Sequence, residues 1–159
     1  MRVPYWAEGG SASLNGRPLE GFASPSSYFV LERTWKDGDH LDVKLPMRLR
    51  IEAMPDDTTL QAVLFGPLVL AGRLGTQGLT EANLRAPPTP PRTVPEIPGD
   101  PLPVPSITAS ASDPTGWLER VPGRLEFRTR AGNPPLTLVP LNRILDERYA
   151  VYWQVATVA

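Results

Sequence analysis

The chain has 159 residues, of which 41% are hydrophobic and 21% are charged, and its formal net charge at pH 7 is −1. This length suits one ordinary domain or two small β modules, and this balance is typical of a globular protein rather than a disordered one. The near-neutral charge argues against nucleic acid or an acidic membrane as a partner, because both require a basic excess.

Two turns with hairpin chemistry lie in the N-terminal part of the chain. Asn15-Gly16 separates Ser11–Leu14 from Arg17–Glu20 and has the residue pair that a tight two-residue hairpin prefers. Lys36-Asp37-Gly38-Asp39 lies between a segment of alternating polarity, residues 28–35, and a second one that begins at Leu41. We therefore expect a second hairpin there, with Gly38 at positive φ.

Period-two alternation continues beyond that turn. Leu41, Val43 and Leu45 alternate with charged residues, and the pattern repeats in the next segment. We expect one buried face and one solvent-exposed face. The expected buried residues are Leu41, Val43, Leu45, Leu49 and Ile51, and the expected outward residues are Asp42, Lys44, Arg48 and Arg50.

Ala62–Leu70 is almost continuously apolar and is interrupted at Gly66-Pro67. This pattern indicates a strand buried on both faces, followed by a kink. The pattern then disappears, and nine of the 20 prolines lie between Pro87 and Pro105. Because proline cannot donate to a sheet ladder, residues 86–105 are expected to be extended and similar to polyproline II.

Strand patterns return in the C-terminal part, at four segments: Trp117–Val121, Leu125–Thr129, Leu136–Val139 and Tyr149–Val155. In the last of these, Tyr149, Val151, Trp153 and Val155 are expected to share one face. No amphipathic helical pattern persists through ten residues. Helix should therefore be scarce.

These elements predict an all-β chain built as a jelly-roll-like β-sandwich. Residues 1–75 form a partial sandwich module, residues 76–105 a Pro-rich connector, and residues 106–159 a short C-terminal β module. The last module is short for an independent core, which favours one core shared by both modules.

The titratable residues offer little catalytic chemistry. Asp37 and Asp39 flank a turn glycine, and Asp56-Asp57 follows Pro55 in a loop, so turn chemistry explains both pairs. Asp146-Glu147-Arg148 precedes an aromatic strand and is more typical of a structural ion pair than of a catalytic group. We therefore predict no catalytic residue.

Metal and cofactor chemistry is equally limited. The chain has no Cys, and His40 is the one His, so a disulfide, a thiolate zinc site and a Cys nucleophile are excluded. No G-x-S-x-G elbow and no glycine-rich phosphate loop occurs. We predict no metal and no cofactor.

The sequence also gives hints about location. No stretch approaches the ~20 apolar residues of a membrane span, and the N-terminal MRVPYW lacks the apolar core of a signal peptide. These features leave the location unknown, with cytoplasm and periplasm both open. The basic residues are Arg except for Lys36 and Lys44, which is typical of a GC-rich bacterial gene.

Aromatic residues offer the remaining functional hint, because a flat exposed ring can stack on a sugar. Trp6, beside Pro4 and outside a clean alternation, is the best candidate for exposure, with Tyr5 and Trp117 as further candidates. The alternative is that these rings pack in the core, which is the commoner position of strand aromatics.

Several segments together resemble one known family. RVPYWAEGGSASLNGRPLE, SYFVLERTWKDGDHLDVKLPMRLRIEAMPDD and AVLFGPLVLAG are similar to the β-sandwich that follows the catalytic barrel in glycoside hydrolase family 127, the β-L-arabinofuranosidases. LVPLNRILDERYAVYWQV is similar to the closing segment of that family. The W-K-D-G-D turn, the G-P-L-V-L-A-G strand and the D-E-R-Y-x-V-Y-W ending occur in the family's order, and the resemblance covers most of residues 2–72 and 136–155.

The resemblance implies an α/α barrel that carries a Cys nucleophile, zinc and Glu residues, followed by β modules, one of which can serve in dimer formation. None of the family's catalytic positions has a counterpart in this sequence. In the family, RVPYWA follows several strands of its sandwich, so the resemblance also implies an incomplete first sandwich, from a split gene or a shortened chain.

These observations predict a non-catalytic structural and interaction module of a glycoside hydrolase. The alternative is a carbohydrate-binding module that uses exposed aromatics. We expect self-association or a glycoside hydrolase barrel as the partner, because exposed strand edges recruit other strands. The open face could instead be covered by the Pro-rich segment folding back, and we favour the second copy because nine prolines make poor ladder partners.

Overall fold

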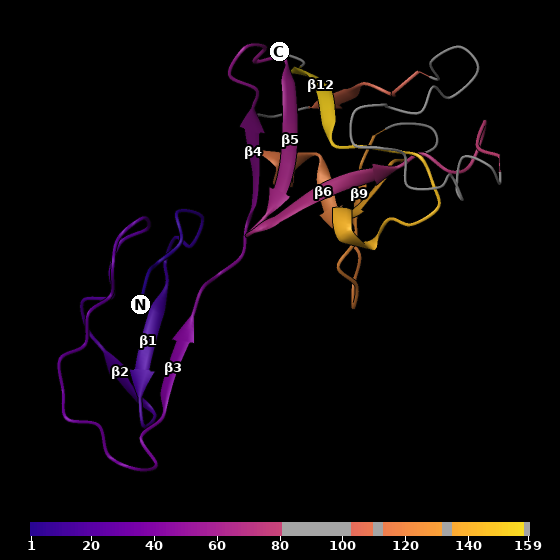
Figure 1. Ribbon diagram of the computed structural model, residues 1–159. Coiled ribbons are helices and arrows are strands. Elements are labelled where there is room, and N and C mark those ends of the chain that lie inside the picture. The colour runs from indigo at the N-terminus through magenta and orange to yellow at the C-terminus, as the bar shows by residue number, and fades with distance from the viewer. Residues whose placement is uncertain (81–102, 110–112, 132–134, 158–159) are drawn as a thin grey trace, which may run out of the picture. The chain divides into compact units, whose positions relative to one another are not determined.

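The computed structural model describes residues 1–80, 103–109, 113–131 and 135–157. Its regular elements are short β-strands, with helix in the described part limited to two 3₁₀ turns, η1 (Pro114–Gly116) and η2 (Leu141–Arg143). The strands form two separate sheets, drawn in Figure 1. The predicted all-β sandwich class with little helix is confirmed.

The chain divides into two compact units, and the division is not a single cut. The first unit comprises residues 1–49 and 65–67, and the second comprises residues 50–64 and 68–159. Phe65-Gly66-Pro67 therefore belongs to the N-terminal unit, although both flanking segments belong to the other.

The N-terminal unit contains a three-stranded antiparallel sheet in the order β2-β1-β3 (Figure 1). Its strands are β1 (Ser11–Leu14), β2 (Arg17–Leu19) and β3 (Leu41–Lys44). Asn15 and Gly16 connect β1 to β2 with φ values of 50° and 77°, which matches the two positive φ angles of a type I′ turn. The predicted Asn15-Gly16 hairpin is confirmed.

The second expected hairpin is only partly correct. The turn exists, because the N–H of Asp39 donates to the carbonyl of Lys36 at 3.1 Å and Gly38 has a φ of 81°. However, residues 29–35 form no strand, and β3 pairs with β1 instead. The alternation in residues 28–35 correctly predicts which side chains are buried, since Phe29 is buried and its neighbours Tyr28 and Val30 are exposed. It does not predict that the segment pairs with another strand.

The core of the N-terminal unit is small. Val3, Ala7, Ala12 and Phe29 are buried, and the rings of Phe22 and Phe29 lie 4.9 Å apart between centroids. Half-buried residues of the surrounding segments pack against this cluster: Trp6, Leu19, Phe22, Ala23, Leu31, Leu41, Val43 and Leu45. The inward row of β3 is therefore as predicted, but it is half-buried rather than fully buried.

The second unit contains the larger sheet, in the order β7-β12-β5-β6-β10-β9-β8, with β4 on β5 and β11 on β6. Its strands are β4 (Leu49–Ala53), β5 (Leu60–Phe65), β6 (Leu68–Arg73), β7 (Ile107–Ala109), β8 (Leu118–Arg120), β9 (Phe127–Thr129), β10 (Thr137–Pro140), β11 (Tyr149–Ala150) and β12 (Tyr152–Thr157). Where their register is defined, neighbours are antiparallel except β12 and β7. The bend at Gly66-Pro67 is confirmed, and Gly66 has a φ of 55°.

This sheet moves the boundary that the sequence suggested. β6 pairs with β10, with Ala71 opposite Val139 and Gly72 opposite Leu138, so residues 60–64 and 68–73 belong with the C-terminal strands. The first module ends near residue 49 and not near residue 75. For the same reason Leu49 and Ile51 do not continue the buried row of β3, because β4 is in a different sheet. Most of the predicted Pro-rich connector lies outside the described residues.

The core of the second unit is formed by large side chains on successive strands. Val63, Leu70, Leu118, Phe127, Leu138 and Trp153 are buried. The predicted C-terminal strands all occur, but the last one is split at Val151 into β11 and β12. The break changes which residues point inward, so Trp153 is fully buried whereas Tyr149 is 53% exposed. The predicted common face for Tyr149 and Trp153 was therefore wrong.

Candidate functional site

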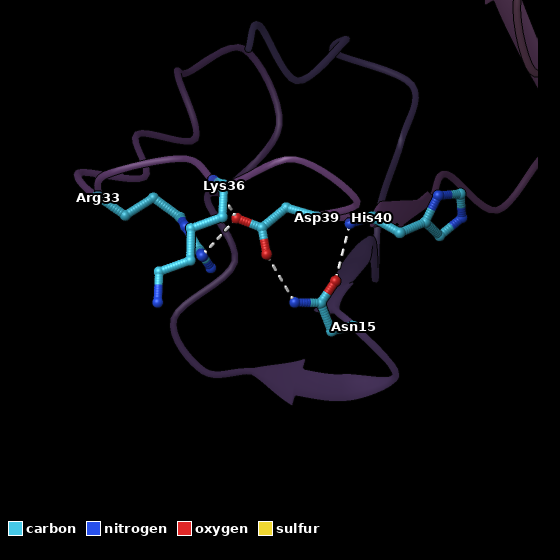
Figure 2. Close-up of polar contacts among 5 residues, drawn as sticks. All are labelled: Asn15, Arg33, Lys36, Asp39 and His40. Carbon is cyan, nitrogen blue, oxygen red and sulfur yellow. Dashed lines mark hydrogen bonds and ion pairs between the residues drawn. The ribbon is translucent and has the colours of Figure 1, made fainter.

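A polar cluster connects the two turns of the N-terminal unit (Figure 2). The Nδ2 of Asn15, in the β1–β2 turn, donates to Oδ1 of Asp39 at 2.8 Å. The Oδ1 of Asn15 accepts from the backbone N–H of His40 at 2.8 Å, and the N–H of Asn15 donates to the carbonyl of His40 at 2.8 Å. Three hydrogen bonds thus hold Asn15 against the 36–40 turn.

The second oxygen of Asp39 has its own donors. Oδ2 accepts from the Arg33 guanidinium at 2.7 Å and from the backbone N–H of Lys36 at 2.8 Å. The pKa of Asp39 is held below its ordinary value, mainly by the hydrogen bond from Asn15 and next by the one from the backbone N–H of Lys36. Desolvation raises this pKa and the positive charge of Arg33 lowers it further, both to a smaller extent. Asp39 is therefore an ionised structural anchor at neutral pH.

Arg33 is the charged member of the alternating row that also contains Phe29, Leu31 and Trp35, and two contacts of its guanidinium account for its position there. Its guanidinium carbon lies 5.0 Å from the ring centroid of Trp35, and one of its nitrogens binds Asp39. A guanidinium over an indole is stabilised by the charge distribution of the ring. Trp35 remains 51% exposed.

The extended segment that contains Arg33 has an unpaired backbone edge. On one side, the carbonyl of Ser27 accepts from the N–H of Val3 at 2.8 Å, and the N–H of Phe29 donates to the carbonyl of Met1 at 2.9 Å. Because backbone groups alternate in direction along an extended chain, and exposure alternates from residue 28 to residue 34, we infer that those of Tyr28, Val30, Glu32 and Thr34 point the other way. Within the part of the chain that the structure describes, these four residues make no backbone hydrogen bond. We call them the open edge.

The residues predicted to stack on sugars have three different positions. Trp117 is only 2% exposed and belongs to the core of the second unit, so its assignment to sugar stacking was wrong. Trp6 is half-buried against the core of the N-terminal unit. Tyr5 is 53% exposed. The structure does not bring Trp117 together with the other two in one unit.

The carboxylates that the sequence pointed out have structural contacts. Asp57 accepts from the backbone N–H and the hydroxyl of Thr59 at 2.9 and 2.6 Å, and these bonds lower its pKa. Glu147, two residues before β11, binds Arg73 of β6 at 2.7 Å. The ion pair expected around residues 146–148 therefore exists, with a partner that the sequence did not indicate.

His40 contacts one carboxylate, Oδ1 of Asp42, at 3.1 Å, and both side chains are mostly exposed. In the described ranges no group of three His, Cys, Asp or Glu side chains is arranged to hold a metal ion. Nor does any described helix have the length and apolarity needed to cross a membrane.

The Asn15–Asp39 connection and the open edge were not predicted. The sequence shows Asn15-Gly16 and Asp37-Gly38-Asp39 as two separate turns, and nothing local in either indicates that they meet. Likewise, alternation in residues 28–35 predicted a paired strand.

Comparisons with known proteins agree with the division into two units. Residues 1–47 match the family model described as the β-L-arabinofuranosidase GH127 middle domain. Residues 50–155 match the family model DUF4986, described as a domain of unknown function. The family boundary thus falls where the structure separates the units, and the resemblance to glycoside hydrolase family 127 is confirmed.

A solved structure titled "Glycoside hydrolase" has a similar fold, with a TM-score of 0.59 at 15% sequence identity. The similarity covers 98% of this chain and 27% of the other, so this chain spans about a quarter of the length of that hydrolase. No curated protein matches. With its larger part matched by one family model and its first residues by another, the chain belongs to the DUF4986 family and carries GH127 middle-domain sequence ahead of it.

Proposed function

We propose that this chain is a non-catalytic interaction module of a GH127-type glycoside hydrolase, and that its open edge pairs with the open edge of a second copy. The observation that carries the proposal is the open edge itself, with its unpaired backbone groups and with Tyr28 and Val30 each 69% exposed. Exposed edges of this kind recruit further strands, and main-chain hydrogen bonds then supply affinity.

The sequence of the edge favours a symmetric partner. Two identical edges that pair antiparallel around Val30 place Val30 opposite Val30 and Tyr28 opposite Glu32. No like charges then oppose each other, and the exposed apolar side chains cover one another. Such pairing is isologous and closes as a dimer.

The experiment is sedimentation velocity at micromolar concentration with two variants. The wild-type chain should be a dimer, and Val30→Lys should be a folded monomer, because it sets two ammonium groups opposite each other on an exposed face. Leu145→Lys is the matched control, since Leu145 is 78% exposed in the other unit, and it should leave the dimer intact. A wild-type monomer, or a dimer that Val30→Lys leaves unchanged, rejects the self-pairing.

The non-catalytic part of the proposal rests on the absence of Cys in the whole chain and on the structural contacts of the carboxylates described above. The purified chain should not hydrolyse an aryl arabinofuranoside and should not retain stoichiometric zinc. Turnover that a point substitution in this chain abolishes contradicts this part without touching the dimer.

Carbohydrate binding is a second candidate, favoured by the half-exposed ring of Tyr5. Half-buried Trp6, the next residue, provides a fluorescence signal, so titration with arabinose-containing oligosaccharides tests it. A saturable change that Tyr5→Ala removes supports binding at this ring. An unchanged signal in the wild-type chain rejects it.

A further inference from the structure

Asn15 combines a reactive sequence with an accessible position. It is one of four asparagines and the one that precedes a glycine; the others precede Leu84, Pro134 and Arg143. A glycine on the C-terminal side leaves the backbone nitrogen unhindered for attack on the asparagine side chain, because it has no Cβ. Asn15 and Gly16 are both exposed.

The attacking group is also available. Gly16 has open space around it: apart from its two chain neighbours, no heavy atom lies within 4 Å of a Cβ built there. Its backbone N–H makes no hydrogen bond to any described residue. The nitrogen that forms the new bond is thus not held by another contact.

The side chain of Asn15, in contrast, is held at both ends. Nδ2 donates to Asp39 and Oδ1 accepts from His40, so the amide points toward the 36–40 turn (Figure 2). Cyclisation requires Cγ to approach the Gly16 nitrogen and Nδ2 to leave. Both movements break these hydrogen bonds, and a bond to a charged acceptor such as Asp39 is stronger than a neutral one.

We propose that Asn15 is a deamidation site whose reactivity is controlled by its hydrogen bond to Asp39. The Gly16 nitrogen bonds to Cγ of Asn15, loses its proton, and expels Nδ2 as ammonia, which leaves a five-membered succinimide. Water then adds to one of the two ring carbonyls and opens the ring. The product is an aspartyl or an isoaspartyl residue.

The product changes the cluster in two ways. A carboxylate replaces the amide donor beside Asp39, so two negative charges face each other where a hydrogen bond existed. Asp39 also anchors Arg33 on the segment of the open edge. Deamidation therefore loosens the connection between the β1–β2 turn and residues 33–40. The isoaspartyl product also inserts a backbone carbon into the type I′ turn.

The test is incubation of the full chain in mildly alkaline buffer, followed by peptide mass spectrometry that separates aspartyl from isoaspartyl products. Asn15 in the folded wild type should react more slowly than in the same chain unfolded in urea. Asp39→Ala should increase the rate at Asn15 by about tenfold, as expected for loss of a hydrogen bond to a charged group. Asp42→Ala is the matched control, because the Asp42 carboxylate is hydrogen-bonded to the His40 ring and, among the described residues, has no hydrogen bond to Asn15.

Circular dichroism shows whether Asp39→Ala folds. If it does not, the comparison of folded and unfolded wild type still decides whether the fold protects Asn15. Equal rates in those two states overturn the proposal, as does a folded Asp39→Ala that reacts at the wild-type rate. Faster modification at Asn142, which precedes Arg143, also overturns it.

Discussion

Trp153 and Gly72 lie so close together that no side chain fits between them: a Cβ built on Gly72 lies 2.3 Å from the Cη2 and Cζ2 atoms of the Trp153 indole. Trp153 is fully buried, and Gly72 pairs with Leu138 of β10 and with Ala150 of β11. The indole thus packs directly on the backbone of β6, and Gly72 is required sterically rather than for a positive φ.

Gly72→Ala should therefore lower the free energy of unfolding by about 1–3 kcal/mol, as for other overpacked cores. Denaturant unfolding monitored by Trp fluorescence or circular dichroism measures the loss. In a double-mutant cycle, Trp153→Phe should recover part of it, because the smaller ring withdraws the atoms that meet the new methyl group. Strictly additive effects of the two substitutions contradict the contact.

Phe29 and Val30 are neighbours on the same extended segment with opposite exposure, 7% and 69%. Phe29→Ala removes the ring that packs on Phe22 and should cost about 3–5 kcal/mol of unfolding free energy. Val30→Ala should change the stability by less than about 0.5 kcal/mol, as for other surface positions. Urea unfolding at a concentration where the chain is monomeric gives both values, and similar losses would show that the register of this segment is wrong.

Asp39 should contribute a pH-dependent part of the stability. Its pKa is lowered in the folded chain, first through Asn15, so its contribution is fully present above the unfolded pKa of about 4 and is lost as the pH falls toward the lowered folded value. Asp39→Asn should therefore be less stable than wild type at neutral pH, and this difference should shrink on acidification below about pH 4. Unfolding midpoints across that range measure it, and Asp57, which is unchanged in both proteins, cancels in the comparison. A constant difference rejects the linkage.

Arg73 and Glu147 form an ion pair in which Arg73 is about half exposed and Glu147 is largely shielded. We expect a coupling free energy of about 0.2–1 kcal/mol from the cycle of Arg73→Ala and Glu147→Ala, and a smaller value in high salt. Arg130 and Glu119, at 3.4 Å with both side chains about half exposed, provide a weaker pair for comparison. If the exposed pair couples more strongly, shielding does not control the strength of these interactions.

Local signals in the sequence predicted local structure well. Asn15-Gly16 specifies its own turn, because both residues adopt positive φ readily. Gly66-Pro67 marks a bend because Gly66 adopts positive φ and the proline has a fixed φ and no N–H for a sheet ladder. The alternating pattern correctly predicted that Phe29 and Val30 point in opposite directions, because in an extended backbone successive side chains alternate whatever the partner strand is. The ladder partner of such a segment depends on residues far along the chain, so β3 was assigned to the wrong neighbour and residues 29–35 to a strand.

The candidate site was predicted less well for the same reason. Trp6 was the first choice for an exposed ring and Trp117 a further candidate, because neither the core around Val3 nor the pairing of β8 with β9 can be read locally. The contact between Asn15 and Asp39 joins residues 24 positions apart. It exists only because β1 pairs with β3, which brings the ends of both strands together.

The return of Phe65-Gly66-Pro67 to the N-terminal unit affects how this protein can be cut and recombined. The N–H of Gly66 donates to the carbonyl of Arg48 at 3.0 Å, and Met47 lies so close that a Cβ on Gly66 would be 2.6 Å from its Cγ. A fragment ending at residue 49 loses this contact, and a fragment starting at residue 50 carries the tripeptide without the residues on which it packs. Cutting the chain once, at the boundary between the two family models, therefore does not separate the two structural units. An exchange of modules between related proteins has to carry residues 65–67 along with the N-terminal piece.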